Sequence, residues 1–322
     1  MLTTARVAHH QLEEGYNIGL LQQIPKGAYT HIIFCGMGGS ALVADMMRDY
    51  VRENITIDVV KDYFIPVGLL RENTLVMLCS YSGNTEETIS CFHQAIDMKL
   101  PTLILAHGGT LEELATENNV PFYKVPKIEE TRCALGFSFG IIIAIFEQMG
   151  VALCNRNILR DTMEFVENHV VEIEAEGKKL AHELEKKVPV FYASASKGSL
   201  ARLMKIHCNE NAKIQSYYGE IPEINHNEMV GYTHLLMTPA LVFMRSQFDF
   251  SKVQLRMDIM KELCEEKGIA CVNLKLKGNS WLDEVYYALM LAYFSTYYLA
   301  ESYSEPYGEL AMVHEFKKRL AA

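Results

Sequence analysis

Hydroxyl and glycine residues gather in a short stretch of the N-terminal half, between an apolar segment and a helical pattern. The stretch CSYSGNTEET (79–88) follows the apolar run 74–78 and brings Ser80, Ser82 and Thr85 to one strand-to-helix turn. Uncharged hydroxyls and the free N–H groups of a helix N-terminus can bind a phosphate without lysine or arginine. The alternative is a serine- and threonine-rich turn with a helix cap, which needs no ligand.

A second stretch of this kind is GMGGS (36–40), which also follows an apolar run and precedes a helical pattern. Gly38 and Gly39 let a backbone approach a ligand closely, and Ser40 adds a hydroxyl. The stretch lacks the third glycine of a dinucleotide fingerprint and the lysine of a P-loop. Ser40 as a simple helix cap is the alternative. Two such turns in one parallel sheet favour a phosphate site, because neighbouring strand-to-helix turns meet at the carboxyl edge.

Arg132 stands at the entrance of an apolar helical pattern, after Glu129 and Glu130. A cation at a helix N-terminus opposes the helix dipole, so its place there suggests an anionic ligand or a developing enolate. A surface ion pair with Glu129 or Glu130 explains it equally well from the sequence.

Two further residues could transfer protons. Glu210, near the end of a helical pattern that starts at residue 198, could be a general base, or a solvated glutamate paired with Lys213. His226 lies between Asn225 and Asn227, which could fix the orientation of its ring.

Metal binding has little support from the sequence. There is no HExxH motif or other spaced His and Cys cluster, and His9, His10 and His31 have no matching ligand set nearby. We therefore expect no metal and no redox cofactor.

Apolar β-branched runs alternate with helical patterns along the chain, which predicts parallel sheets covered by helices. Strands are expected near 31–37, 55–60, 74–80, 102–106, 122–125, 188–193, 214–218, 240–244 and 270–276, and helices near 40–51, 85–98, 111–118, 133–149, 281–301 and 309–321, with a capping box at 110–113. A faint repeat places Gly-Ser at a helix entrance after the first strand of each half. The expected organisation is domain 1 at 1–153, a charged helical connector at 154–187, and domain 2 at 188–322.

Composition limits the classes of partner. The chain has 322 residues, a formal charge of −10, and eight cysteines without CxxC spacing. The negative charge argues against nucleic acid or an anionic membrane as a partner. We expect buried, reduced cysteines, no apolar run long enough to cross a membrane, and a cytoplasmic protein.

Four motifs together resemble one known family. GMGGSA (36–41), SYSGNTEET (80–88), NENAK (209–213) and PEINHNE (222–228), in this order, are similar to the bifunctional phosphoglucose/phosphomannose isomerases. The first two motifs mark sugar isomerase (SIS) domains in general, and the last two are more specific to this family. The resemblance spans roughly residues 30 to 320 and implies an α/β protein with two SIS-type domains, each a doubly wound, mainly parallel sheet flanked by helices.

The resemblance also implies roles. The phosphate cradle of a hexose 6-phosphate would comprise Gly38, Gly39, Ser40, Ser80, Ser82 and Thr85. Glu210 would move a proton between C1 and C2, Arg132 would steady the enediolate, and His226, from the neighbouring subunit of a homodimer, would assist ring opening. Lys317, or alternatively Lys318, matches a C-terminal lysine that also assists ring opening.

The implied activity is aldose–ketose isomerisation of glucose 6-phosphate and fructose 6-phosphate through a cis-enediolate, without a cofactor. Mannose 6-phosphate stays open as a second substrate, because residues 305–310 (EPYGEL) lack the threonine that the family has near its last helix. The alternatives are a non-catalytic sugar-phosphate sensor and an isomerase of another sugar phosphate, such as an amino sugar. A sensor would need the cradle but not Glu210, His226 and Arg132 together.

Overall fold

The structure is a computed structural model that describes residues 1–308 and 310–320. The chain forms two compact units. The N-terminal unit contains residues 3–168 and 278–286, and the C-terminal unit contains residues 1–2, 169–277 and the described residues from 287 onward. Each unit is built on its own parallel sheet.

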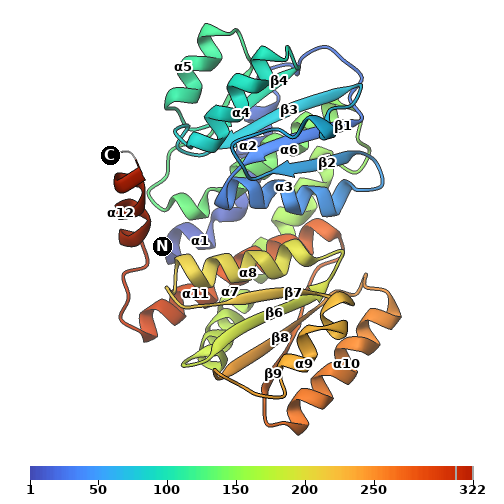
Figure 1. Cartoon of the computed structure of the whole chain (residues 1–322), viewed down its shortest axis with the longest axis vertical. Helices are drawn as coiled ribbons and strands as arrows, with labels where there is room; N and C mark the ends of the chain where they lie inside the picture. The colour runs from blue at the N-terminus through green and yellow to red at the C-terminus, as the bar shows by residue number, and fades with distance from the viewer. Residues whose placement is uncertain (309, 321–322) are drawn as a thin grey trace. The chain divides into compact units, whose positions relative to one another are not determined.

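The sheet of the N-terminal unit has five parallel strands in the order β2-β1-β3-β4-β5 (Figure 1). The strands are β1 (His31–Gly36), β2 (Thr56–Val60), β3 (Thr74–Ser80), β4 (Thr102–Ala106) and β5 (Phe122–Lys124). Strands β1, β3 and β4 are buried along their whole length, as expected for the interior of a sheet covered on both faces.

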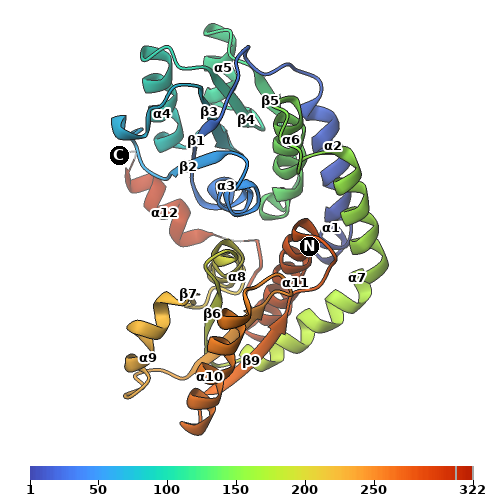
Figure 2. The ribbon, with the colours of Figure 1, turned by 90° about the vertical axis from the view of Figure 1, so that its right-hand side faces the viewer.

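Helices cover both faces of this sheet. They are α2 (Gln11–Gly19), α3 (Gly38–Val51), α4 (Glu86–Asp97), α5 (Thr110–Glu117) and α6 (Leu135–Gln148). The N-terminal part of the chain also contains the short helices α1 (Leu2–Arg6), η1 (Ala8–His10), η2 (Val67–Leu69) and η3 (Thr131–Cys133). Alternate residues of the strands, such as Ile33 and Val76, share a core with Phe92 of α4 and Leu111 of α5. Figure 2 shows α4 and α5 on one side of the strands, with α2 and α6 on the other.

The C-terminal unit repeats this architecture with a four-stranded parallel sheet in the order β7-β6-β8-β9. Its strands are β6 (Val188–Ser194), β7 (Tyr217–Ile221), β8 (Pro239–Arg245) and β9 (Ala270–Lys275). The remaining elements are α8 (Gly198–Glu210), η4 (Glu223–His226), α9 (Glu228–Gly231), α10 (Ser251–Glu266) and α12 (Ala311–Leu320). Strands β6 and β8 share a core with α10 that includes Tyr192, Phe243, Met257 and Met260.

Two long helices belong to both units, α7 (Arg156–Leu184) and α11 (Trp281–Ser302). The segment 154–187, expected to be a connector, is largely the single helix α7, and the contacts divide the units inside it, at residues 168 and 169. A return of the chain to the N-terminal unit at 278–286 was not expected from the sequence. Phe139 and Tyr286 pack edge to face there, with ring centroids 5.7 Å apart.

The alternation of strands and helices confirms the predicted α/β class with parallel sheets, and most predicted elements lie within a few residues of their positions. The strand predicted at 214–218 lies later, at Tyr217–Ile221, because its segment 214–216 precedes the pairing with β6. Helices α1, α2, α9 and α10 were not predicted. The last predicted helix, 309–321, appears as Ala311–Leu320, with residues 309 and 321 outside the described part.

The helix α6 is apolar all round, which is typical of a core helix or a membrane span. Within the described residues, the window Thr131–Gln148 meets the length and composition of a membrane span, which the sequence analysis did not expect, and 78% of it is buried in the fold. No disulfide joins the eight cysteines, all of which lie in the described residues, and seven of them are buried, as predicted.

The turn after β3 is joined to the start of α5. The carbonyl of Gly83 accepts a hydrogen bond from the N–H of Leu111 (3.0 Å), and Asn84 Oδ1 accepts from the N–H (2.9 Å) and hydroxyl (3.0 Å) of Thr110. The predicted capping box at 110–113 was therefore wrong. Asn84 from the neighbouring turn caps α5, and Thr110 already lies in the helix, with Gly109 as the N-cap residue.

Gly83 is required at this junction for two reasons. Its φ is +70°, in the left-handed region, and a Cβ there would overlap the carbonyl oxygen of Gly108. Any larger residue must either separate the two loops or strain the backbone.

We predict that Gly83→Ala lowers the free energy of unfolding by about 2–4 kcal/mol, since strain and overpacking add. Gly150→Ala is the matched control, because Gly150 has a similar φ (+81°) but open space around its Cβ position among the described residues. Urea unfolding of both variants measures the difference. Equal destabilisation would show that the contact between the two loops contributes little.

Candidate active site

The two hydroxyl- and glycine-rich turns lie at the ends of neighbouring strands. Strands β1 and β3 are parallel partners, and Gly36 at the end of β1 is opposite Cys79 near the end of β3. In the order β2-β1-β3-β4-β5, the chain reverses direction between β1 and β3, so the helices that follow them leave toward opposite faces. Ligands of doubly wound sheets bind in the crevice at this point.

The turn after β1 leads directly into α3. Gly38 has a φ of +50°, which favours glycine, and the chain enters the helix at this residue. The first N–H groups of a helix have no acceptor within the helix, so those of Gly38, Gly39 and Ser40 are suited to an anion. Met37 rather than Ser40 is the N-cap residue.

The turn after β3 is held by its own hydroxyls. Ser80 Oγ and Thr85 Oγ1 are 2.8 Å apart, and Ser80 Oγ also accepts from the N–H of Gly83 at 3.2 Å. Ser82 Oγ accepts from the N–H of Asn84 at 3.2 Å. Ser80 is buried, Thr85 is half-buried and Ser82 is exposed, so the three hydroxyls run from the sheet edge toward solvent.

Charge alone does not make this edge attractive to an anion. Glu86 and Glu87 occupy the first turn of α4, where they complement the helix dipole but repel a phosphate. Burial also raises the pKa of the Cys79 thiol to about 11, although hydrogen bonds with Ser40 and Ser138 oppose this, so Cys79 stays neutral at pH 7. A phosphate here would depend on backbone N–H groups and hydroxyls as donors.

The C-terminal unit has an equivalent edge between β6 and β8, but the carboxylate of Asp249 occupies the donors at this edge. Asp249, after β8, accepts from Ser194 Oγ at the end of β6 (2.5 Å) and from the N–H of Ser246 (3.0 Å). Asp249 is 8% exposed. An anion of the protein therefore takes the donors that an external anion would need at this edge.

Glu210 is the last residue of α8, and its neighbours fix the end of this helix. Asn209 Nδ2 donates to the carbonyl of Ile214 (2.8 Å), while the fully buried Asn211 bonds with His207 Nδ1 (2.9 Å) and Thr296 Oγ1 (3.0 Å). Glu210 itself is half-buried. The motif NEN thus holds a partly accessible carboxylate between two amides that bond to other parts of the same unit.

His226 is exposed at the end of η4. The expectation that the flanking asparagines orient its ring differs from the structure, where both amides bond elsewhere. Asn225 Nδ2 donates to the sulfurs of Met229 (3.3 Å) and Met260 (3.4 Å). Asn227 Nδ2 donates to Glu223 Oε1 (2.7 Å), and its Oδ1 accepts from the N–H of Glu228. The asparagines therefore position the segment rather than the ring.

The remaining candidates lie in different elements. Arg132 is half-buried in η3, at the entrance of α6 in the N-terminal unit. Lys317 and Lys318 are exposed on α12 in the C-terminal unit. Within the N-terminal unit, the structure brings the six cradle residues to one sheet edge. Glu210, His226 and Lys317 belong to the C-terminal unit.

Sequence reasoning missed the residues that support these candidates. The sequence analysis gave Asn211 no role of its own within the motif NENAK. Its side chain is fully buried next to the candidate base Glu210, and this burial of a polar group is what marks it. Asp249 gave no sequence signal, because its partner Ser194 is 55 positions earlier in the chain.

Comparisons with known proteins agree with this architecture. Residues 173–320 match the sequence model of the bacterial phospho-glucose isomerase C-terminal SIS domain. The chain is 32% identical to the bifunctional phosphoglucose/phosphomannose isomerase of Aquifex aeolicus, over 91% of each chain. It is 26% identical to the D-glucosamine-6-phosphate 4-epimerase of Sulfolobus acidocaldarius, over 70% of this chain and 72% of that protein.

A solved structure shares the fold. A hypothetical protein from Thermus thermophilus superposes with a TM-score of 0.74 at 15% identity, over 100% of this chain and 91% of that one. The match to a SIS-domain model and the two parallel sheets flanked by helices confirm the predicted α/β fold with two SIS-type domains. The identity and coverage shared with the Aquifex protein also confirm the resemblance found in the sequence, and the chain belongs to the bifunctional phosphoglucose/phosphomannose isomerase family.

Proposed function

We propose that this protein is an aldose–ketose isomerase that interconverts glucose 6-phosphate and fructose 6-phosphate, with mannose 6-phosphate as a second aldose substrate. Family membership supports this reaction class. The observation that carries the proposal is that two turns rich in glycine and hydroxyls begin at the carboxyl edge of β1 and β3, where their N–H groups and hydroxyls are suitable donors for a phosphate ester.

The N-terminal unit is proposed to hold the phosphate. Gly38, Gly39 and Ser40 would supply helix N–H groups, while Ser80, Ser82 and Thr85 would supply hydroxyls. Binding energy from this end of the sugar is independent of the reacting carbons, so it can position them. The C-terminal unit is not proposed to bind phosphate at its equivalent edge, because Asp249 occupies it.

The proposed chemistry is proton transfer between two neighbouring carbons. Glu210 would remove the proton from C2 and return it to C1 through a cis-enediolate, a step of general base catalysis that contributes about 10²–10⁴-fold. The guanidinium of Arg132 would stabilise the enediolate oxygens. His226 and Lys317, with Lys318 as its alternative, would exchange protons with the ring oxygen and O1 during ring opening. The reaction needs no redox cofactor, since the substrate is oxidised at one carbon and reduced at the next.

A homodimer is part of the proposal, with His226 supplied by the neighbouring subunit as the family resemblance implies. Its exposure at the end of η4 is compatible with that role. A cytoplasmic location also belongs to the proposal. The charge of −10 supports the further proposal that the protein binds neither nucleic acid nor anionic membranes.

An amino-sugar phosphate is the second candidate substrate, because a relative that acts on D-glucosamine 6-phosphate matches 70% of this chain. A non-catalytic sensor of sugar phosphates is the third. A sensor would not need the three proposed catalytic groups Glu210, His226 and Arg132.

We predict that glucose 6-phosphate and mannose 6-phosphate both yield fructose 6-phosphate in a coupled assay, with glucose 6-phosphate turned over faster. Glucosamine 6-phosphate is the third arm of the panel, and we expect it to give no ketose. Turnover of glucosamine 6-phosphate alone would replace the proposed substrate, and no turnover of any sugar would favour the sensor.

We predict that Ser82→Ala combined with Thr85→Ala raises KM for fructose 6-phosphate by about tenfold or more, because each lost hydroxyl bond to a charged group is worth roughly 1.5–3 kcal/mol. Steady-state kinetics measures KM and kcat. Thr116→Ala, an exposed hydroxyl of α5 in the same unit, is the control. An unchanged KM in the double variant would remove these residues from the phosphate site.

We predict that Glu210→Gln lowers kcat by about 10²–10⁴-fold while inorganic phosphate still inhibits by binding, since only the base is lost. The control is Glu266→Gln, which changes the exposed last residue of α10 in the same unit. Turnover like that of the unmodified enzyme would exclude Glu210 from the reaction.

The same variant also tests the shared site. If His226 comes from the neighbouring subunit, a mixture of Glu210→Gln and His226→Ala proteins regains measurable activity after subunit exchange, because mixed dimers hold one intact site. Activity no higher than that of either variant alone would place both residues in one subunit.

A further inference from the structure

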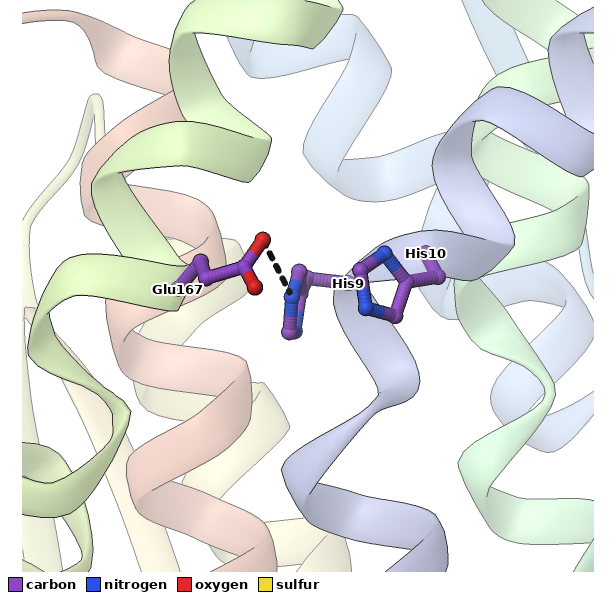
Figure 3. A group of neighbouring side chains, drawn as sticks. All are labelled: His9, His10 and Glu167. Carbon is purple, nitrogen blue, oxygen red and sulfur yellow. Dashed lines mark ion pairs between the residues drawn. The ribbon is translucent and has the colours of Figure 1, made fainter.

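Two adjacent histidines and a distant glutamate come together within the N-terminal unit. His9 and His10 belong to η1, and Glu167 belongs to α7. One side-chain donor atom from each residue lies within 4.8 Å of the other two. Figure 3 shows the carboxylate of Glu167 extending from α7 toward the ring of His9, with the ring of His10 beside it.

His9 is the unusual member of this group. Its side chain is 3% exposed, and neither ring nitrogen has a hydrogen-bond partner among the described residues. Its Nε2 is 3.9 Å from Glu167 Oε2, too far for a hydrogen bond. Buried polar atoms in native proteins are almost always bonded, so an exception indicates a missing water, ion or functional role.

The imidazole of His9 is suited to donate an electron pair. Burial and, to a smaller extent, the neighbouring His10 lower its pKa to about 4, and Glu167 partly opposes this. At pH 7 His9 is therefore neutral, as a metal ligand must be. The two rings lie with centroids 4.1 Å apart and planes tilted by 42°, so both can present nitrogens on one side.

We propose that His9, His10 and Glu167 form a binding site for a divalent transition-metal ion, best matched by Zn²⁺. Two imidazoles and one carboxylate are a ligand set that zinc takes in proteins, with water in the fourth position. Hard cations such as Mg²⁺ prefer oxygen ligands, and thiolate-selective ions would need cysteine.

The distances allow this ion with a small movement. Zinc bonds to nitrogen and oxygen of roughly 2.0–2.2 Å place ligand atoms about 3.3–3.5 Å apart in a tetrahedron. The separation of 3.9 Å between His9 and Glu167 is therefore slightly open. His10 and Glu167 are exposed and can rotate inward, while the buried His9 keeps its place.

The ion would fasten the N-terminal segment to α7. All five strands of the N-terminal sheet lie between segment 8–10 and residue 167 in the sequence. The ion would link these two distant parts of the chain directly. This role is structural and separate from the isomerase reaction, so binding rather than turnover tests it.

The test is titration of the full-length, chelator-treated protein with Zn²⁺ by calorimetry and with Co²⁺ by absorption spectroscopy. We expect one equivalent of Zn²⁺ to bind, and His10→Ala and Glu167→Gln each to weaken binding by about tenfold or more. Both changes are at exposed side chains, so the fold should persist. The matched control is His182→Ala, which removes an exposed histidine 4.0 Å from Glu185.

A substitution at the same position gives a positive signature. His10→Cys should retain the ion and add a thiolate-to-cobalt charge-transfer band that the unmodified protein lacks. That band would place residue 10 in the coordination sphere and exclude binding at the native cysteines. Equal affinity in the unmodified protein, His10→Ala and Glu167→Gln, or the same band in the unmodified protein, would overturn the proposal.

Discussion

The parallel pairing of β1 with β3 is the constraint on which the candidate site depends. It places Gly36 opposite Cys79, so that a glycine turn and a hydroxyl turn begin at the same edge of the sheet. Both strands are buried along their whole length, and a shift of one residue would turn every side chain to the opposite face of the sheet. The hydrogen bonds around Ser80 then set the positions of the hydroxyls in the second turn.

The two units share an architecture but differ in the groups at the carboxyl edge of the sheet. Each has turns at the carboxyl edge of its two central strands, but in the C-terminal unit Asp249 accepts hydrogen bonds there from Ser194 and Ser246. A buried carboxylate with charge-assisted hydrogen bonds makes the same kind of contacts as a bound anion. The proposed division of labour follows: one unit binds the phosphate, and the other presents the groups for proton transfer.

The candidate carboxylate and imidazole depend on amides that do not themselves react. Asn209 and Asn211 fasten the end of α8 on either side of Glu210, and Asn225 and Asn227 fasten η4 and α9 around His226. Such bonds hold the backbone of a reactive group while leaving its side chain accessible. Catalytic geometry of this kind requires supporting contacts that limit motion to a fraction of an ångström.

The sequence by itself determined the α/β class, most strands and helices, the burial of the cysteines and the position of the candidate residues on strand-to-helix turns. These follow from local periodicity and turn chemistry, which act over a few residues. Only the tertiary structure decided that Asn84 caps α5, that Asp249 bonds to Ser194, that the chain divides inside α7, and that Glu167 meets His9 and His10. Each of these features depends on residues that are distant in the chain. Strand pairing and helix packing bring such residues together, and neither leaves a local pattern in the sequence.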